Sequence, residues 1–178
     1  MSLFKLFEKD SVDIVFIGDS HIEMCNWADM FNNDCVRNMG IHGNVLEGVI
    51  DEVKYLPYCK DVVLMVGIND LRSHKNVSLL VEQYDTLTKL LKRRNPNIQI
   101  TINSILPMSS QLNVFDSKIL STNDQLMELC ERNNFHFINL YPLFVEKDND
   151  LNSEYTFDGL HLNGKGYMLW SEILNERK

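Results

Sequence analysis

The chain has 178 residues, of which 44% are hydrophobic and 24% are charged, a balance typical of a globular protein with a sizeable buried core. Its net charge is −8, from 25 acidic and 17 basic residues, and the lack of a long basic run argues against a nucleic-acid partner. Residues 1–10 are interrupted by charge and lack the apolar core of a signal peptide, and no later stretch is apolar enough to span a membrane. The sequence therefore predicts a single domain over residues 1–178 that is located in the cytoplasm and does not bind a membrane.

The four cysteines are scattered along the chain without a C-x-x-C pair. They are Cys25, Cys35, Cys59 and Cys130. Each lies in an apolar pattern, so we expect buried free thiols rather than disulfides or a metal site. We accordingly expect neither a bound metal nor another cofactor.

The first predicted strand is the apolar run from Ile14 to Ile17, which Gly18 closes. Because the run is apolar without alternation, we expect helices to cover both faces of this strand. A helix-like apolar pattern follows over residues 22–31. The turn between them places Ser20 at the carboxyl end of the strand, where open α/β sheets bind ligands. Ser20 is therefore either a nucleophile or an ordinary helix N-cap.

Four more strands follow in chain order, with helices between them. The predicted strands are residues 34–40, 61–67, 98–103 and 135–140. The predicted helices are residues 45–53, 77–94 and 115–133, with a last helix that ends at Leu174. Asn44 is expected to cap the first of these helices. The alternation predicts an α/β fold, a three-layer αβα sandwich, whose five parallel strands take a flavodoxin-like order with the most apolar strand, 61–67, at the centre.

Unusual residues lie at four predicted strand ends, and the carboxyl ends of parallel strands meet at one edge of a sheet. A nucleophilic Ser20 needs a base, and His161 suits that role near neutral pH. Asp158, three residues earlier, can fix the tautomer of the His161 ring. The N–H groups of Ser20 and Gly43 and the amide of Asn69 can stabilise an oxyanion.

Four motifs carry a resemblance that covers nearly the whole chain. They are Gly18-Asp19-Ser20, Gly40-Ile41-His42-Gly43, Gly67-Ile68-Asn69-Asp70 and Asp158-Gly159-Leu160-His161. In order and spacing they resemble the four blocks of the SGNH (GDSL-type) hydrolase family, and are most similar to its branch of platelet-activating-factor acetylhydrolases and bacterial acetylesterases. The resemblance implies the SGNH hydrolase fold and a Ser-His-Asp triad of Ser20, His161 and Asp158. It also implies an oxyanion hole made by Ser20, Gly43 and Asn69.

Five residues in or beside these motifs need an interpretation of their own. His21 stands where the GDSL name expects Leu, and we interpret it as a pocket-rim or helix-start residue rather than a rival base. Asp19 is expected to order the turn through backbone hydrogen bonds. His42 is either a surface histidine or a substrate contact. Tyr155 and Phe157 either line a substrate pocket or pack beneath the loop.

The predicted function is that of a serine esterase acting on a small-molecule ester. The loops 104–113 and 141–157 are too short to form a lid, and the second is polar, so a short acyl group on a polar alcohol, such as an O-acetylated carbohydrate, fits best. The same site also suits an O-acetyltransferase, or a lipase or thioesterase for longer acyl groups. A nucleotide-binding protein would need glycine-rich phosphate loops that the sequence lacks. A metal-dependent phosphoesterase would leave Ser20 and Asn69 without a role. The oligomeric state stays open.

Overall fold

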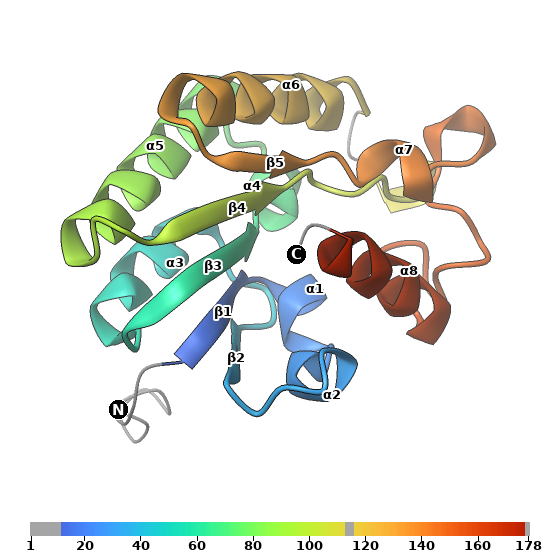
Figure 1. The fold of residues 1–178 in the computed structure, drawn as a ribbon. Helices are drawn as coiled ribbons and strands as arrows, with labels where there is room; N and C mark the ends of the chain where they lie inside the picture. The colour runs from blue at the N-terminus through green and yellow to red at the C-terminus, as the bar shows by residue number, and fades with distance from the viewer. Residues whose placement is uncertain (1–11, 113–115, 177–178) are drawn as a thin grey trace.

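A computed structural model describes residues 12–112 and 116–176 of the chain. Its five strands are all parallel and form one sheet in the order β2-β1-β3-β4-β5 (Figure 1). They are β1 (Val12–Gly18), β2 (Val36–Gly40), β3 (Cys59–Met65), β4 (Gln99–Asn103) and β5 (His136–Ile138). The flavodoxin-like order and the central place of the third strand are confirmed. The predicted features of residues 1–10, and the start of the predicted helix 115–133, lie outside the described residues.

Helices cover both faces of the sheet (Figure 1). One face carries α3 (Leu46–Glu52), α5 (Val77–Arg94) and α6 (Asp116–Asn133). The other carries α1 (Ser20–Glu23), α2 (Trp27–Met30), α7 (Tyr141–Phe144) and α8 (Gly164–Asn175). Short helical turns fill the connections: α4 (Ile68–Arg72), η2 (Val53–Tyr55), η3 (Ser110–Leu112) and η4 (Lys147–Asn149). None of the described helices is both long enough and apolar enough to cross a bilayer.

Strand β1 shows why its sequence is apolar without alternation. Val15 and Ile17 belong to the core cluster beneath α3, α5 and α6, whereas Ile14 and Phe16 belong to the cluster beneath α1, α2 and α8. All four side chains are at most 8% exposed. Side chains of a strand alternate between its faces, so a strand covered on both faces needs apolar residues at every position.

The single helix predicted over residues 22–31 is wrong, because two single-turn helices take its place. The amide of Asn38, from β2, donates to the carbonyl oxygens of Ile22 (2.8 Å), Glu23 (3.2 Å) and Cys25 (2.8 Å). The indole N–H of Trp27 also donates to the Ile22 carbonyl, at 2.9 Å. Contacts from elsewhere in the fold therefore take up carbonyls that a continuous helix would have used for its own hydrogen bonds.

Two smaller expectations are also corrected. Asn44 does not cap the first turn of α3, since its Oδ1 accepts only from the next backbone N–H, that of Val45. The N–H of Leu46 instead donates to Oδ2 of Asp70, at 3.0 Å. Among the cysteines, Cys35 is exposed, while the other three are buried free thiols as predicted.

The strand ends that lead to the predicted site lie at one level of the sheet. Gly18 of β1 pairs with Gly40 of β2 on one side and with Met65 of β3 on the other. Gly40 also lies against α1, where a Cβ atom would come within 2.2 Å of the Glu23 nitrogen. The loops that leave these strands therefore start side by side and closely packed.

Candidate active site

Ser20 is the first residue of α1 and lies two positions beyond the end of β1. It is 4% exposed. Asp19 is the N-cap of α1, and its carboxylate accepts from the backbone N–H of His21 at 3.0 Å. This contact confirms that Asp19 orders the turn, and it shows that the cap is Asp19 rather than Ser20.

Ser20, His161 and Asp158 form a continuous chain of hydrogen bonds. Nε2 of His161 lies 3.0 Å from Oγ of Ser20, and Nδ1 of the same ring lies 2.7 Å from Oδ2 of Asp158. The His161 side chain is 15% exposed and that of Asp158 is 38% exposed. The three side chains are hydrogen-bonded in the order Ser-His-Asp that the sequence predicts.

The carboxylate of Asp158 is held by the loop that carries it. Its Oδ1 accepts from the backbone N–H groups of Leu160 (2.9 Å) and His161 (2.8 Å). Burial raises the pKa of this carboxyl, but hydrogen bonds from the His161 ring and from the two N–H groups outweigh it and lower the pKa to about 2. Asp158 is thus an anion at neutral pH. It fixes a proton on Nδ1 and leaves the lone pair of Nε2 facing Ser20.

The loop over residues 156–162 is held by hydrogen bonds within the loop and by one to the neighbouring loop, residues 104–113. The hydroxyl of Thr156 donates to the His161 carbonyl at 2.7 Å and accepts from the N–H of Gly159 at 2.9 Å. Gly159 has a φ of +77°, a conformation that favours glycine. Its carbonyl accepts from the N–H of Ser109 at 2.8 Å, which ties the loop to residues 104–113. The position of the His161 ring is therefore set by a compact turn.

Gly43 and Asn69 lie in loops that touch each other at the same edge of the sheet. Gly43 has a φ of +72° in an exposed turn, and a Cβ atom there would meet nothing within 4 Å. Asn69 is the second residue of α4, and its amide donates to the carbonyl of Asn44 at 2.9 Å. An amide nitrogen carries two hydrogens, so this contact occupies one and leaves the other for a ligand.

Asp70 braces these two loops, a role that the sequence reading missed. It is fully buried and accepts from the Leu46 N–H at the start of α3, while its other oxygen is paired with the ammonium of Lys75. Lys75 donates in addition to Oε1 of Gln83 at 2.9 Å. The sequence signal for this role of Asp70 was an acidic residue directly after Asn69 with a lysine five residues later.

Three rings were predicted as substrate contacts, and two of them flank His161. The His42 ring lies 5.8 Å from the His161 ring and the Phe157 ring lies 6.2 Å from it, both nearly parallel to it. Both side chains are well exposed. Tyr155 packs edge to face on Phe144 at 5.4 Å, in the core beneath the loop. Its role as a substrate contact stays a prediction, and the structure gives it a packing role.

His21 departs from the interpretation as a pocket-rim residue. It does begin a helix, as the second residue of α1, but it is only 3% exposed. Within residues 12–112 and 116–176, no group of three or more His, Cys, Asp or Glu side chains is arranged to hold a metal ion.

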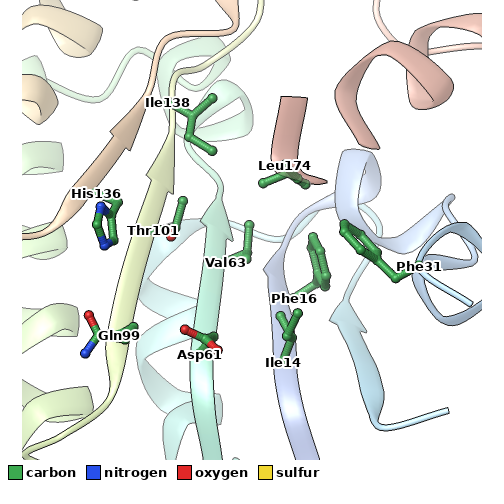
Figure 2. A pocket seen from close by; sticks show the side chains of 10 residues that line it. All are labelled: Ile14, Phe16, Phe31, Asp61, Val63, Gln99, Thr101, His136, Ile138 and Leu174. Carbon is green, nitrogen blue, oxygen red and sulfur yellow. The ribbon is translucent and has the colours of Figure 1, made fainter. Parts of the chain in front are cut away.

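A hollow of about 170 Å³ lies away from this site, on one face of the sheet. Figure 2 shows it beside the amino-terminal halves of β1, β3 and β4, with Ile14, Asp61 and Gln99 at one end. None of the residues described around it belongs to the triad. Ser20 lies instead at the carboxyl edge of the sheet, bonded to His161, beside which the rings of His42 and Phe157 are exposed.

Comparisons with known proteins show the family to which the chain is similar. The sequence model of the GDSL-like Lipase/Acylhydrolase family matches residues 16–169, which include all four motifs. Subunit alpha2 of the human platelet-activating factor acetylhydrolase IB is 25% identical over 171 residues, covering 92% of this chain and 75% of that protein.

Two further proteins are similar over most of this chain. An N-acylneuraminate cytidylyltransferase of Escherichia coli is 32% identical over 180 residues, covering 93% of this chain and 41% of that protein. The crystal structure of an acetyl xylan esterase superposes with a TM-score of 0.75 at 20% identity, covering 93% of this chain and 99% of the other. The last comparison shows a shared fold.

The lowered pKa of Asp158 predicts that its carboxyl keeps the NMR signal of the ionised form from about pH 5 to about pH 3, where an ordinary aspartate titrates. Because the folded-state pKa is lowered, ionised Asp158 stabilises the fold above the unfolded value of about 3.9. That contribution is lost as the pH falls through about 2.

In His161→Ala the ring no longer donates to the Asp158 carboxylate, so the pKa of Asp158 rises toward the range between about pH 3 and about pH 5. The matched control is His42→Ala, which removes a neighbouring ring without touching Asp158 and leaves the signal unchanged. A titration midpoint of about 4 for Asp158 in the wild type would contradict the assigned hydrogen bonds.

Proposed function

The chain belongs to the GDSL-like lipase/acylhydrolase family and is a carboxylic ester hydrolase, and from that premise we propose that it is a serine esterase for short acyl groups. Ser20 is the nucleophile, His161 the general base and Asp158 its partner. The observation that carries the proposal is the pair of contacts of the His161 ring, 3.0 Å to Ser20 Oγ and 2.7 Å to Asp158 Oδ2.

The reaction follows from these contacts. Nε2 of His161 takes the proton of Ser20 as Oγ attacks the ester carbonyl carbon, and Asp158 stabilises the imidazolium that forms. The backbone N–H groups of Ser20 and Gly43 and the free amide hydrogen of Asn69 donate to the developing oxyanion. His161 then protonates the leaving alcohol, and a water molecule releases the acyl group from Ser20 by the same steps.

The acyl group that we propose is acetyl, carried by a sugar or similar polar alcohol. The related human protein is by name an acetylhydrolase, and the related E. coli protein is by name an enzyme of N-acylneuraminate, an acidic sugar. With the exposed rings of His42 and Phe157 beside His161, we take the site to be shallow, which suits a small acyl group on a bulky alcohol. A long acyl chain would need a deep apolar channel, since each buried CH₂ contributes only about 0.8 kcal/mol and only when it leaves water.

Replacing Ser20 with alanine tests the nucleophile. We expect the wild type to hydrolyse p-nitrophenyl acetate, with or without a chelator, and to take up one fluorophosphonate label on Ser20. Ser20→Ala should lose both hydrolysis and labelling while its thermal melting stays close to that of the wild type. The control is Ser171→Ala, which changes a buried serine in α8 whose hydroxyl donates to the Met168 carbonyl. Full activity in Ser20→Ala, or a label on another residue, would rule out Ser20 as the nucleophile.

Replacing Asn69 with alanine tests the oxyanion hole. We expect kcat to fall by roughly 10²–10³ with a smaller change in KM, because the donor acts mainly in the transition state. Asn97→Ala, at an exposed position after α5, serves as the control and should match the wild type. If Asn69→Ala instead raises KM and keeps kcat, the amide binds the substrate in its ground state and the oxyanion role is wrong.

The shallow site predicts a preference for small acyl groups. Along the p-nitrophenyl esters from acetate to octanoate, kcat/KM should fall steeply for the wild type. Measuring the same series with an added sugar acceptor separates hydrolysis from acyl transfer, because transfer yields an acylated sugar instead of free acid. A rise of kcat/KM with chain length would move the assignment to a lipase or thioesterase.

A further inference from the structure

His21, the residue after the nucleophile, has a second set of contacts that the proposed reaction does not use. Its Nδ1 lies 3.2 Å from Oδ1 of Asp19, and its Nε2 lies 2.9 Å from the carbonyl oxygen of Leu160. Asp19 is 1% exposed and His21 is 3% exposed. The ring of His21 therefore bridges the start of α1 and the loop between Asp158 and His161, inside the protein.

Both partners of the His21 ring are acceptors. An ionised carboxylate and a backbone carbonyl have no hydrogen to donate, and a neutral imidazole carries only one N–H. A neutral ring would therefore leave one nitrogen lone pair facing an oxygen lone pair, in a buried place where the cost is high. Against an ionised Asp19, only the imidazolium form, with a hydrogen on each nitrogen, makes both contacts.

The surroundings offer no other way to satisfy this ring. Asp19 and His21 border a small hollow with no room for a water molecule, whose other walls are apolar. These walls are Met65, Val66, Ile68, Ile105 and Leu106. A ring nitrogen that lost its hydrogen bond here could not turn to solvent instead.

The charged and titratable groups around His21 also favour its cationic form. Burial lowers the pKa of the ring, but the hydrogen bond and charge of Asp19, the Leu160 carbonyl and the charge of Asp158 together raise it above its usual value. The His161 ring lies 5.8 Å away, and the hydroxyl of Tyr167 donates to the backbone carbonyl of His21 at 2.9 Å.

We propose that His21 is a positioning residue whose buried imidazolium fastens the loop of Asp158 and His161 to the helix that carries Ser20. The proposal rests on the proposed function in one respect, namely that His161 acts on Ser20. His21 follows Ser20 directly, and Leu160 precedes His161 directly, so one hydrogen bond joins the two reacting residues through their chain neighbours. It holds His161 Nε2 at its 3.0 Å from Ser20 Oγ.

This link makes activity sensitive to pH on the alkaline side. A histidine whose pKa is raised in the fold contributes stability that is complete below its unfolded value, about 6.5, and is lost as the pH rises through the folded value. When His21 loses a proton, the Asp19 carboxylate keeps the hydrogen on Nδ1, so Nε2 no longer donates to the Leu160 carbonyl and the loop is released from α1. A pH profile of kcat/KM should therefore fall on the alkaline side as His21 deprotonates.

The charge of His21 can be measured without any turnover. Long-range ¹H–¹⁵N spectra of the wild type at pH 7.5, above the usual value of about 6.5, should show two protonated nitrogens in the His21 ring. A single protonated nitrogen at that pH would overturn the proposal. Because this measurement needs no substrate, it decides the state of His21 even if the protein hydrolyses no ester, which would refute the proposed function alone.

The positioning role is tested by His21→Gln with Tyr167→Phe as its matched control. We expect His21→Gln to lower kcat by roughly tenfold to a hundredfold, with KM little changed, and to lose the alkaline fall, because small misplacements of reacting groups are costly. Tyr167→Phe removes a buried hydrogen bond to the same residue but not the bridge, so it should lose stability and keep the wild-type pH profile. Equal rates and profiles for His21→Gln and the wild type, or the same losses in both variants, would overturn the proposal.

Discussion

The parallel register of the first three strands is the constraint on which the site depends. Because Gly18 pairs with both Gly40 and Met65, three chain segments leave the sheet at one level. The polypeptide then needs only two to four residues to bring Ser20, Gly43 and Asn69 to the same edge. The fourth segment, which carries Asp158 and His161, comes from beyond the sheet, and it therefore has to be fastened by contacts of its own.

The contacts that hold these loops together are polar and buried, and they join one loop to another. The N–H of Ile41 donates to the Gly18 carbonyl at 3.1 Å, and the amide of Asn69 donates to the Asn44 carbonyl, so the first three loops bind one another in turn. Asp70 adds an ion pair with Lys75 beneath them. Buried hydrogen bonds of this kind contribute modestly when made and cost more when left unmade, so they fix geometry rather than supply bulk stability.

Much of the fold was predictable because it depends on local pattern. The apolar run of β1 and the three- and four-residue spacing in α5 each predict an element from local residues alone, and the first three motifs follow strands β1, β2 and β3 as predicted. The prediction that Asp158 and His161 also lie at a strand end is wrong, because β5 ends at Ile138 and two short helices come before them. What failed depends on distant partners. The amide of Asn38 donates to carbonyls within the expected helix over 22–31, Asp70 of α4 accepts from the first N–H of α3, and the buried His21 ring contacts the Leu160 carbonyl. No spacing pattern in the sequence predicts a hydrogen bond between residues 139 positions apart.

The division of that expected helix has a mechanical consequence. One face of the sheet is covered by α5 and α6, each of 18 residues, and by α3 of seven. The other is covered by α1, α2 and α7, each of four residues, and by α8 of 12. Short helices depend on tertiary contacts for their existence, and regions of this kind open at lower free energy than long packed helices. Ser20 thus lies on the side with the shortest helices, where we expect amide hydrogens to exchange with solvent faster than those of α5 and α6. A protein built in this way can loosen around its substrate without unfolding the half that holds the sheet together.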